Sequence, residues 1–223
     1  MQTFATPAPI TTVLDIPAGR IRFVATDRID TVVEVRPANA AKRHDVGVAE
    51  LTSVDYADGM LQIRTAPAKH PLIGHSGAVE VTVQLPAGSR VEARADSADL
   101  HSTGRLGDVT FESSAGEVGL DEVASARLTV QAGDIAVGRL GGPAELRTRK
   151  GDLTVTEAAL GEVVLHTEAG QVSVGAARGV SASLDAGTGF GRIHNALRNG
   201  EGGASTLRFR ATTGYGDITA RSL

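Results

Sequence analysis

Acidic residues directly follow glycine or alanine at regular intervals in the second half of the chain. They are Asp99, Glu117, Asp134, Asp152 and Asp217. If the fold stacks these positions, neighbouring carboxylates lie about 4.8 Å apart, and oxygens gathered at that spacing could bind Ca²⁺. Calcium-binding repeats have a period of about nine residues, whereas the period here is about twice that, and Gln171 and Arg192 interrupt the series. We therefore interpret each carboxylate as an acceptor for a local backbone N–H at a turn and predict no metal site.

Other residues that could carry out catalysis form no recognisable set. The chain has no cysteine, no Gly-x-Ser-x-Gly elbow and no phosphate-binding glycine loop. Its histidines lack metal-ligand spacing, and only His70 and His75 share one Pro- and Gly-rich segment, Ala66 to Gly77. Two acids on adjacent turns of a repeat would lie close together, but no such pair is singled out. We predict no catalytic residue and no cofactor.

Two aromatic residues occupy matching places in the last repeats. Phe190 and Tyr215 stand in Gly-Phe-Gly and Gly-Tyr-Gly, which look like two-residue insertions after Gly189 and Gly214. Paired corner aromatics could stack on a sugar or on a partner surface. We favour the alternative that they cap the C-terminal end, together with a loop over residues 197–206. The candidate binding surface at this corner comprises Phe190, Tyr215, His194 and Arg192.

All these residues belong to a repeated sequence pattern. Each copy is marked by an anchor residue, which is Ala98 in the first copy and a glycine at positions 116, 133, 151, 170, 189 and 214 in the others. The spacing between anchors is 17 to 19 residues, except for the last, which is wider. Aligning the anchors produces columns that are always apolar, next to polar neighbours. One column contains Leu100, Val118, Ile135, Leu153, Val172, Ile193 and Ile218; a second contains Ala93, Phe111, Leu128, Leu146, Leu165, Leu184 and Phe209; a third contains Leu106, Val123, Leu140 and Leu160.

This combination of period-2 alternation within a repeat and identity between repeats predicts an all-β β-solenoid. We expect about seven rungs of roughly 18 residues over residues 86–223. Residues 1–85 are expected to form an irregular β cap region, continuous with the solenoid. Within that region we predict strands at Thr11–Asp15, Arg20–Thr26, Thr31–Pro37, Glu50–Tyr56, Met60–Thr65 and Val79–Leu85. The phrase Ile16–Ile21 resembles Leu85–Val91, so the winding is expected to start within this region.

Charges outside the apolar columns alternate in sign between neighbouring repeats. Three cross-rung ion pairs are predicted: Arg94 with Glu112, Arg127 with Glu145, and Asp185 with Arg210. Such pairs contribute little free energy, but they help to fix the register between similar rungs.

Composition excludes several classes of protein. Among 223 residues there are 27 Gly, five Phe, two Tyr and no Trp, which suits a narrow interior filled by Val, Leu, Ile and Ala. A net charge of −4 argues against nucleic-acid binding. No apolar run approaches the roughly 18 residues of a membrane span, and the N-terminus does not resemble a secretory signal. The expected location is therefore cytoplasmic by default, with a surface location left open.

The residues also resemble a known family. The phrases PAGRIRFVATD…TVVEVRP, VEVTVQLPAGSRVEARADSADL and SAGEV…QAGDI…RKGDL are similar to those of the bacterial "putative adhesin" family of β-strand repeat proteins. The resemblance covers nearly the whole chain. It implies a β-solenoid fold and, by analogy with the adhesin label, recognition of a surface, but no defined biochemical activity.

Two functions from different classes follow. The first is a non-catalytic β-solenoid scaffold that binds a protein or glycan surface and forms a weak homodimer through its C-terminal end, at the strand Asp217–Leu223. The alternative is a carbohydrate-active β-helix enzyme, a lyase or a hydrolase. The regular ladder without a catalytic constellation favours the scaffold.

Overall fold

The computed structural model describes residues 1–66, 77–198 and 206–223. The chain divides into two compact units, Met1–Gly116 and Glu117–Leu223. Both consist almost wholly of β-strands, which confirms the predicted all-β class and its solenoid-like repeat. The expected boundary between residues 85 and 86, the count of about seven rungs and the N-terminal cap remain predictions.

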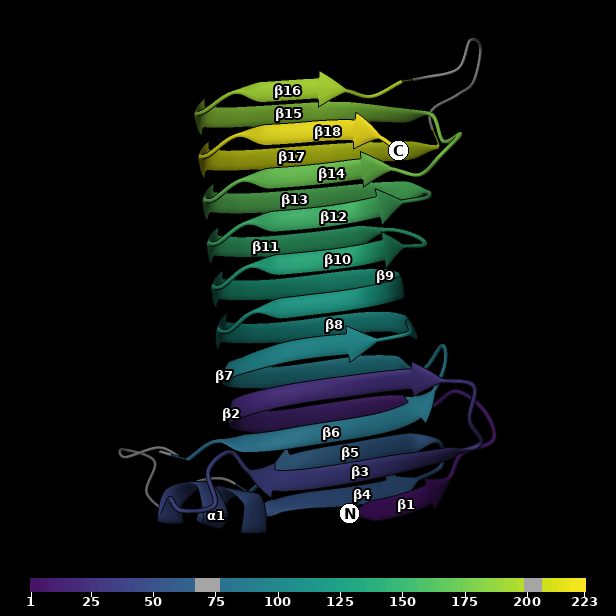
Figure 1. The fold of residues 1–223 in the computed structure, drawn as a ribbon, viewed down its shortest axis with the longest axis vertical. Coiled ribbons are helices and arrows are strands. Elements are labelled where there is room, and N and C mark those ends of the chain that lie inside the picture. The colour runs from purple at the N-terminus through teal and green to yellow at the C-terminus, as the bar shows by residue number, and fades with distance from the viewer. Residues whose placement is uncertain (67–76, 199–205) are drawn as a thin grey trace. The chain divides into compact units, whose positions relative to one another are not determined.

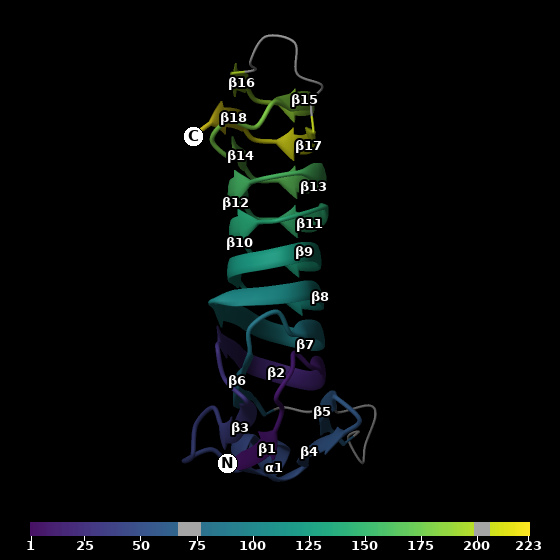
Figure 2. The ribbon, with the colours of Figure 1, turned by 90° about the vertical axis from the view of Figure 1, so that its right-hand side faces the viewer.

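The second unit is built from two facing parallel sheets (Figure 2). Its strands are β9 (Val118–Ala132), β10 (Ile135–Leu140), β11 (Ala144–Lys150), β12 (Leu153–Ala158), β13 (Gly161–Ala169), β14 (Val172–Ala176), β15 (Ala182–Phe190), β16 (Ile193–Ala196), β17 (Leu207–Tyr215) and β18 (Ile218–Ser222). A rung is one strand of each sheet joined at a corner, as β11 and β12 are. Equivalent residues of neighbouring rungs are therefore hydrogen-bonded neighbours in a sheet.

Apolar residues of alternate positions fill the space between these two sheets. Ile135 pairs in register with Leu153, and both are fully buried, as the column predicted. Because side chains on a strand alternate between its two faces, the residues between them, such as Ala136, lie at the surface. One assignment in the third column was wrong: Leu160 is 52% exposed, and Ala158 instead pairs with Leu140 in the core.

The order of the last rungs differs from their order in the chain. Strands β17 and β18 lie between β13–β14 and β15–β16 (Figure 1). The prediction that Asp217–Leu223 forms an exposed end was therefore wrong, because β18 pairs with β14 on one side and β16 on the other. The inward residues explain this order. Those of β17 and β18 are buried and, apart from Thr213, apolar, whereas β16 places the polar Asn195 opposite the buried Ala220.

The register of the last two rungs also corrects the sequence alignment. Tyr215 pairs with Ala169 and with Phe190, so the corner glycines are Gly216 and Gly191, and Gly214 and Gly189 precede them. There is no two-residue insertion. Gly216 has φ +148°, and a Cβ there would lie 2.0 Å from the carbonyl oxygen of Gly170, so only glycine fits this corner.

The same shift rearranges the second apolar column. Leu165 pairs with Ala211, and Phe209 pairs with Val163 and Leu184. The predicted column that joined Leu165 to Leu184 and Phe209 was therefore two residues out of register. Phe209 is fully buried in its actual position.

The first unit combines parallel and antiparallel pairing. Its elements are β1 (Gln2–Ala5), β2 (Thr11–Thr26), β3 (Asp30–Pro37), α1 (Arg43–Glu50), β4 (Thr52–Ala57), β5 (Met60–Thr65), β6 (Val79–Pro86), β7 (Arg90–Thr103) and β8 (Arg105–Ala115). Strand β2 is parallel to β7 and places Gly19 opposite Ala98. The similar phrases Ile16–Ile21 and Leu85–Val91 do not mark paired positions, because Gly19 pairs with Ala98 and not with Gly88.

Most strands predicted for residues 1–85 are present, with two of them joined as β2. Strand β1 and the helix α1 were not predicted from the sequence. The helix has only eight residues, too few to display a helical periodicity. Tertiary contacts hold it: Val48 is buried, and the buried Asp45 side chain accepts a hydrogen bond from the Ala78 N–H at 3.0 Å.

Candidate functional site

Three of the acidic corner residues accept hydrogen bonds from backbone N–H groups. A carboxylate oxygen of Asp134, Asp152 and Asp217 accepts the backbone N–H of Asp152, Gln171 and Arg192, at 2.8, 2.7 and 2.8 Å. This confirms the interpretation of these carboxylates as N–H acceptors, except that the donor lies on the neighbouring rung instead of in the same turn. Across the described residues, no three His, Asp or Glu side chains gather as a metal site.

The three predicted cross-rung ion pairs are all present. Their N–O distances are 3.2 Å for Arg94–Glu112, 3.4 Å for Arg127–Glu145 and 3.7 Å for Asp185–Arg210. Most of these side chains are more than half exposed, so each pair contributes at most about 1 kcal/mol. They help to fix the register, because a slip between rungs would separate the opposite charges.

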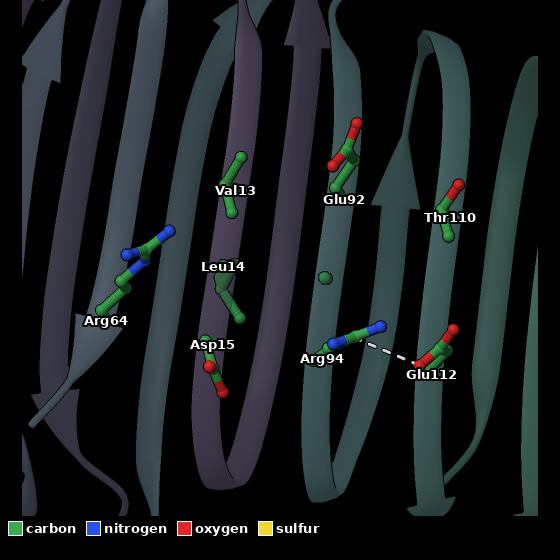
Figure 3. A pocket seen from close by; sticks show the side chains of 9 residues that line it. Val13, Leu14, Asp15, Arg64, Glu92, Arg94, Thr110 and Glu112 are labelled. Carbon is green, nitrogen blue, oxygen red and sulfur yellow. Dashed lines mark ion pairs between the residues drawn. The ribbon is translucent and has the colours of Figure 1, made fainter. Parts of the chain in front are cut away.

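A groove of about 360 Å³ runs across the outer surface of the first unit (Figure 3). Strands β5, β2, β7 and β8 place Arg64, Asp15, Arg94 and Glu112 in one cross-strand row of alternating charge. The acids of this groove are exposed or half-buried and stand beside arginines. General acid catalysis needs a carboxyl group that keeps its proton, usually through burial or a carboxylate neighbour. The groove offers neither feature.

The pKa of Asp30, at the start of β3, is lowered, whereas a carboxyl group that acts as a general acid needs a raised pKa. Arg28 donates a hydrogen bond from Nε to Asp30 Oδ1 at 2.9 Å. This hydrogen bond, with the charge of the guanidinium, holds the pKa of Asp30 below its usual value. Asp30 is therefore an ion-pair partner and not a proton donor.

Phe190 and Tyr215 form an exposed aromatic pair on the second unit. Their rings are stacked, with centroids 4.9 Å apart and planes 6° from parallel. The side chains are 69% and 63% exposed. The favoured prediction that they cap the interior was therefore wrong: each ring directly precedes a corner glycine and points outward from its sheet. The two rings instead form an exposed aromatic surface; that this surface binds a sugar or a partner remains a prediction.

The other two candidate residues lie at different distances from this pair along the rung. Arg192 is on the far side of the corner glycine from Phe190, and its Nη2 lies 3.6 Å from Asp217 Oδ2. Its side chain is 90% exposed. His194 lies two residues further on, in β16 of the other sheet, opposite Thr219. The corner thus unites Phe190, Tyr215 and Arg192, while His194 belongs to the adjoining face.

Two groups of residues were missed from the sequence. The first continues the aromatic column: Ala169 pairs with Tyr215, and Lys150 pairs with Ala169, both exposed. The second is a ladder of threonines three residues before the corner glycines. Each hydroxyl donates to the corner carbonyl of the neighbouring rung on one side: Thr148 to Gly133, Thr167 to Gly151, Thr213 to Gly170 and Thr188 to Gly216, at 2.9 to 3.1 Å. The recurring Thr-x-x-Gly was the signal that could have found it.

Two sequence predictions fall on residues outside the description. His70 and His75 lie within residues 67–76, and most of the expected 197–206 loop lies within residues 199–205. In the described ranges, no helix has the length and apolar character that crossing a membrane requires.

Residues 30–222 match the family described as Toastrack DUF4097. The chain belongs to this family. The match confirms the resemblance inferred from the sequence, and one solved structure of similar fold is described as a putative adhesin. No curated protein sequence matches the chain.

The solved relatives of this Toastrack domain are distant in sequence. A "putative adhesin" from Bacteroides fragilis is 14% identical, with a TM-score of 0.50, and the match covers 98% of this chain and 95% of that one. A "putative adhesin" from Parabacteroides distasonis is 15% identical, with a TM-score of 0.43 and coverage of 100% and 95%. A "putative lipid binding protein" from the same species is 10% identical, with a TM-score of 0.48 and coverage of 98% and 95%. Identities this low bear on the fold alone.

Proposed function

We propose that this Toastrack domain is a non-catalytic recognition scaffold that binds a glycan through its aromatic corner. The observation that carries the proposal is the stacked, outward-facing pair Phe190 and Tyr215. The scaffold supplies rigidity, because each ring stands on a strand whose backbone is paired with its neighbours.

Exposed aromatic surface of this size is costly in water. A Phe or Tyr side chain has about 150–250 Å² to bury, so two rings that are about two-thirds exposed leave on the order of 200–300 Å² uncovered. At about 25 cal/mol per Å², covering them could release at most roughly 5–7 kcal/mol. A ligand that stacks on the rings gains part of this free energy.

The size and surroundings of the aromatic pair favour a sugar over a protein partner. A protein interface buries about 800 Å² per partner around an apolar centre. Here the rings are flanked along the chain by glycines, and the charged Arg192 and Asp217 follow the corner. A pyranose ring needs one aromatic face for its C–H groups and polar side chains nearby for its hydroxyls, which is what this corner presents.

The enzyme alternative lacks support. The acidic corner residues accept backbone N–H groups, and the acids of the groove in the first unit alternate with arginines. Neither arrangement resembles the paired carboxylates, one protonated and one ionised, that cleave a glycosidic bond.

Binding of oligosaccharides tests the proposal directly. Tyr56 and Tyr215 are the two tyrosines of the chain, and there is no tryptophan. In a Tyr56→Phe background, the intrinsic fluorescence therefore reports on Tyr215 alone. We expect a saturable change on titration with oligosaccharides and a loss of affinity of at least about tenfold in Phe190→Ser. The matched control is Phe4→Ser, since Phe4 contacts the ring at position 56 in the other unit. Binding that survives in Tyr215→Ser, measured by calorimetry, would contradict the proposal.

A further inference from the structure

The aromatic column continues beyond the two rings into a slot. The registers of β11, β13, β17 and β15 place four exposed residues in one line across neighbouring strands: Lys150, Ala169, Tyr215 and Phe190. Phe190 covers one face of the Tyr215 ring. The other face is on the side of Ala169, whose methyl group is the only side chain between Tyr215 and Lys150 in this line.

The width of this slot matches one ring. Adjacent strands are about 4.8 Å apart, so the backbones at Lys150 and Tyr215 are separated by roughly 10 Å. A ring stacked on Tyr215 at about 3.5–4 Å would lie above Ala169 and leave about 6 Å to the lysine strand. One pyranose ring therefore fits, with the lysine ammonium within reach of its substituents.

The charges around the slot leave Lys150 available. Arg149 is paired with Glu168 at 3.6 Å, and Arg192 is paired with Asp217 at 3.6 Å. Asp152, across the corner from Lys150, already uses Oδ1 to accept the Gln171 N–H. Among the described residues, no carboxylate lies within ion-pair distance of the Lys150 ammonium. An anionic group of a ligand can therefore pair with this ammonium.

We propose that the slot over Ala169 binds an acidic sugar residue of a polysaccharide, a uronate. This inference rests on the proposed glycan-binding function and adds the class of sugar. The pyranose ring stacks on the free face of Tyr215, and its carboxylate pairs with Lys150. Glu168 directly precedes Ala169 and Gln171 lies two residues after it; both are exposed and offer polar groups to the hydroxyl groups of the sugar.

The test compares two trisaccharides of equal length, one of galacturonate and one neutral, of glucose. Titrations use the Tyr56→Phe protein and are carried out in EDTA, so that no metal ion bridges the carboxylates. We expect the uronate to bind roughly two- to fivefold more tightly, the range of an exposed ion pair. The preference should disappear in Lys150→Gln and weaken at high salt, while Lys42→Gln, an exposed lysine of the other unit, retains it.

Filling the slot tests its position. Ala169→Leu should block both sugars, whereas Ala132→Leu should not, although Ala132 is exposed in the same column on the opposite side of Lys150. Equal binding of the two sugars that calorimetry shows to be lost in Tyr215→Ser would overturn the uronate inference and leave the proposed function standing. Uronate binding that persists in Ala169→Leu would overturn the slot. Binding of neither sugar would overturn both proposals and leave the aromatic pair to a protein contact.

Discussion

Thr188 donates its hydroxyl hydrogen bond to the carbonyl oxygen of Gly216 at 3.0 Å, although Gly216 lies 28 residues further along the chain. The same bond joins Thr213 to Gly170, so the rung that contains Gly216 lies between the other two. The last rung in sequence, β17 and β18, therefore lies between the rung of β13 and β14 and the rung of β15 and β16. This places Tyr215 directly beside Phe190 and creates the aromatic pair.

The threonine ladder should contribute to stability. Thr213 is 5% exposed, and its hydroxyl is 2.9 Å from the carbonyl of Gly170. Thr213→Val keeps the shape of the side chain but removes its hydroxyl group. The carbonyl oxygen of Gly170 then loses this hydrogen bond. We expect a loss of about 1–3 kcal/mol in the free energy of unfolding, measured by chemical denaturation. Thr219→Val, at a half-buried position on the neighbouring strand, is the control and should change stability much less. Equal losses in the two variants would show that the ladder adds nothing.

The regular part of the fold could be predicted because each rung repeats the same local pattern. Period-2 alternation placed Ile135 and Leu153 in the core, and charge alternation placed Arg127 beside Glu145. The pattern became ambiguous at Gly-Phe-Gly and Gly-Tyr-Gly, where either glycine could be the corner. Thr188 and Thr213, three residues before Gly191 and Gly216, resolve the ambiguity, since Thr148 and Thr167 stand in the same place before their corners.

The order of the last rungs was not predictable from local pattern. Repeats that are adjacent in sequence are expected to be adjacent in space. Only a comparison of the inward-facing residues of the last two rungs favours another order. Asn195 occupies a position that is apolar in the other rungs, and a polar group is tolerated better at an end than in the middle of a core. The aromatic pair depends on this order, because the order places Tyr215 directly beside Phe190.

A charge placed in the core should unfold the second unit. Ile135 is fully buried between Val118 and Leu153 in its sheet. Ile135→Asp would bury an unpaired carboxylate at a cost of several kcal/mol, comparable to the whole stability of a domain. Ala136→Asp, one residue along and exposed, should melt close to the parent in circular dichroism. A melt of Ile135→Asp unchanged from the parent would show that the register is wrong.

Calcium should not stabilise the protein. Asp152 Oδ1 is 2.7 Å from the Gln171 N–H, so the corner carboxylate stabilises the backbone without a metal ion. We expect the same melting temperature in EDTA and in millimolar Ca²⁺. Asp152→Asn, which keeps an acceptor oxygen, should be milder than Asp152→Ala, which should cost about 0.5–1.5 kcal/mol. A clear rise of the melting temperature with calcium would support calcium binding by the column of acidic corner residues, because a ligand that binds only the folded state must stabilise it.

The expected weak homodimer should form through β15 and β16 instead of the C-terminal strand. Among the described strands, β15 pairs with β17 and β16 pairs with β18, which places both strands at the end of the ladder of described rungs. Ile193 on this rung is 47% exposed, whereas Ile218 is fully buried. A second copy related by a two-fold axis presents the same two edges at the same spacing, so both can pair at once. A single extended peptide could pair with only one of them.

Light scattering over a concentration series decides whether this end self-associates. We expect the average mass of the parent to rise with concentration and that of Ile193→Lys to stay monomeric, because the lysine places like charges opposite each other across the two-fold axis. Ile29→Lys, at an isoleucine 75% exposed in the other unit, should associate as the parent does. A parent that stays monomeric at high concentration contradicts the dimer. If association is retained in Ile193→Lys but lost in Ile29→Lys, the dimer interface lies on the first unit, near Ile29, and not at the edges of β15 and β16.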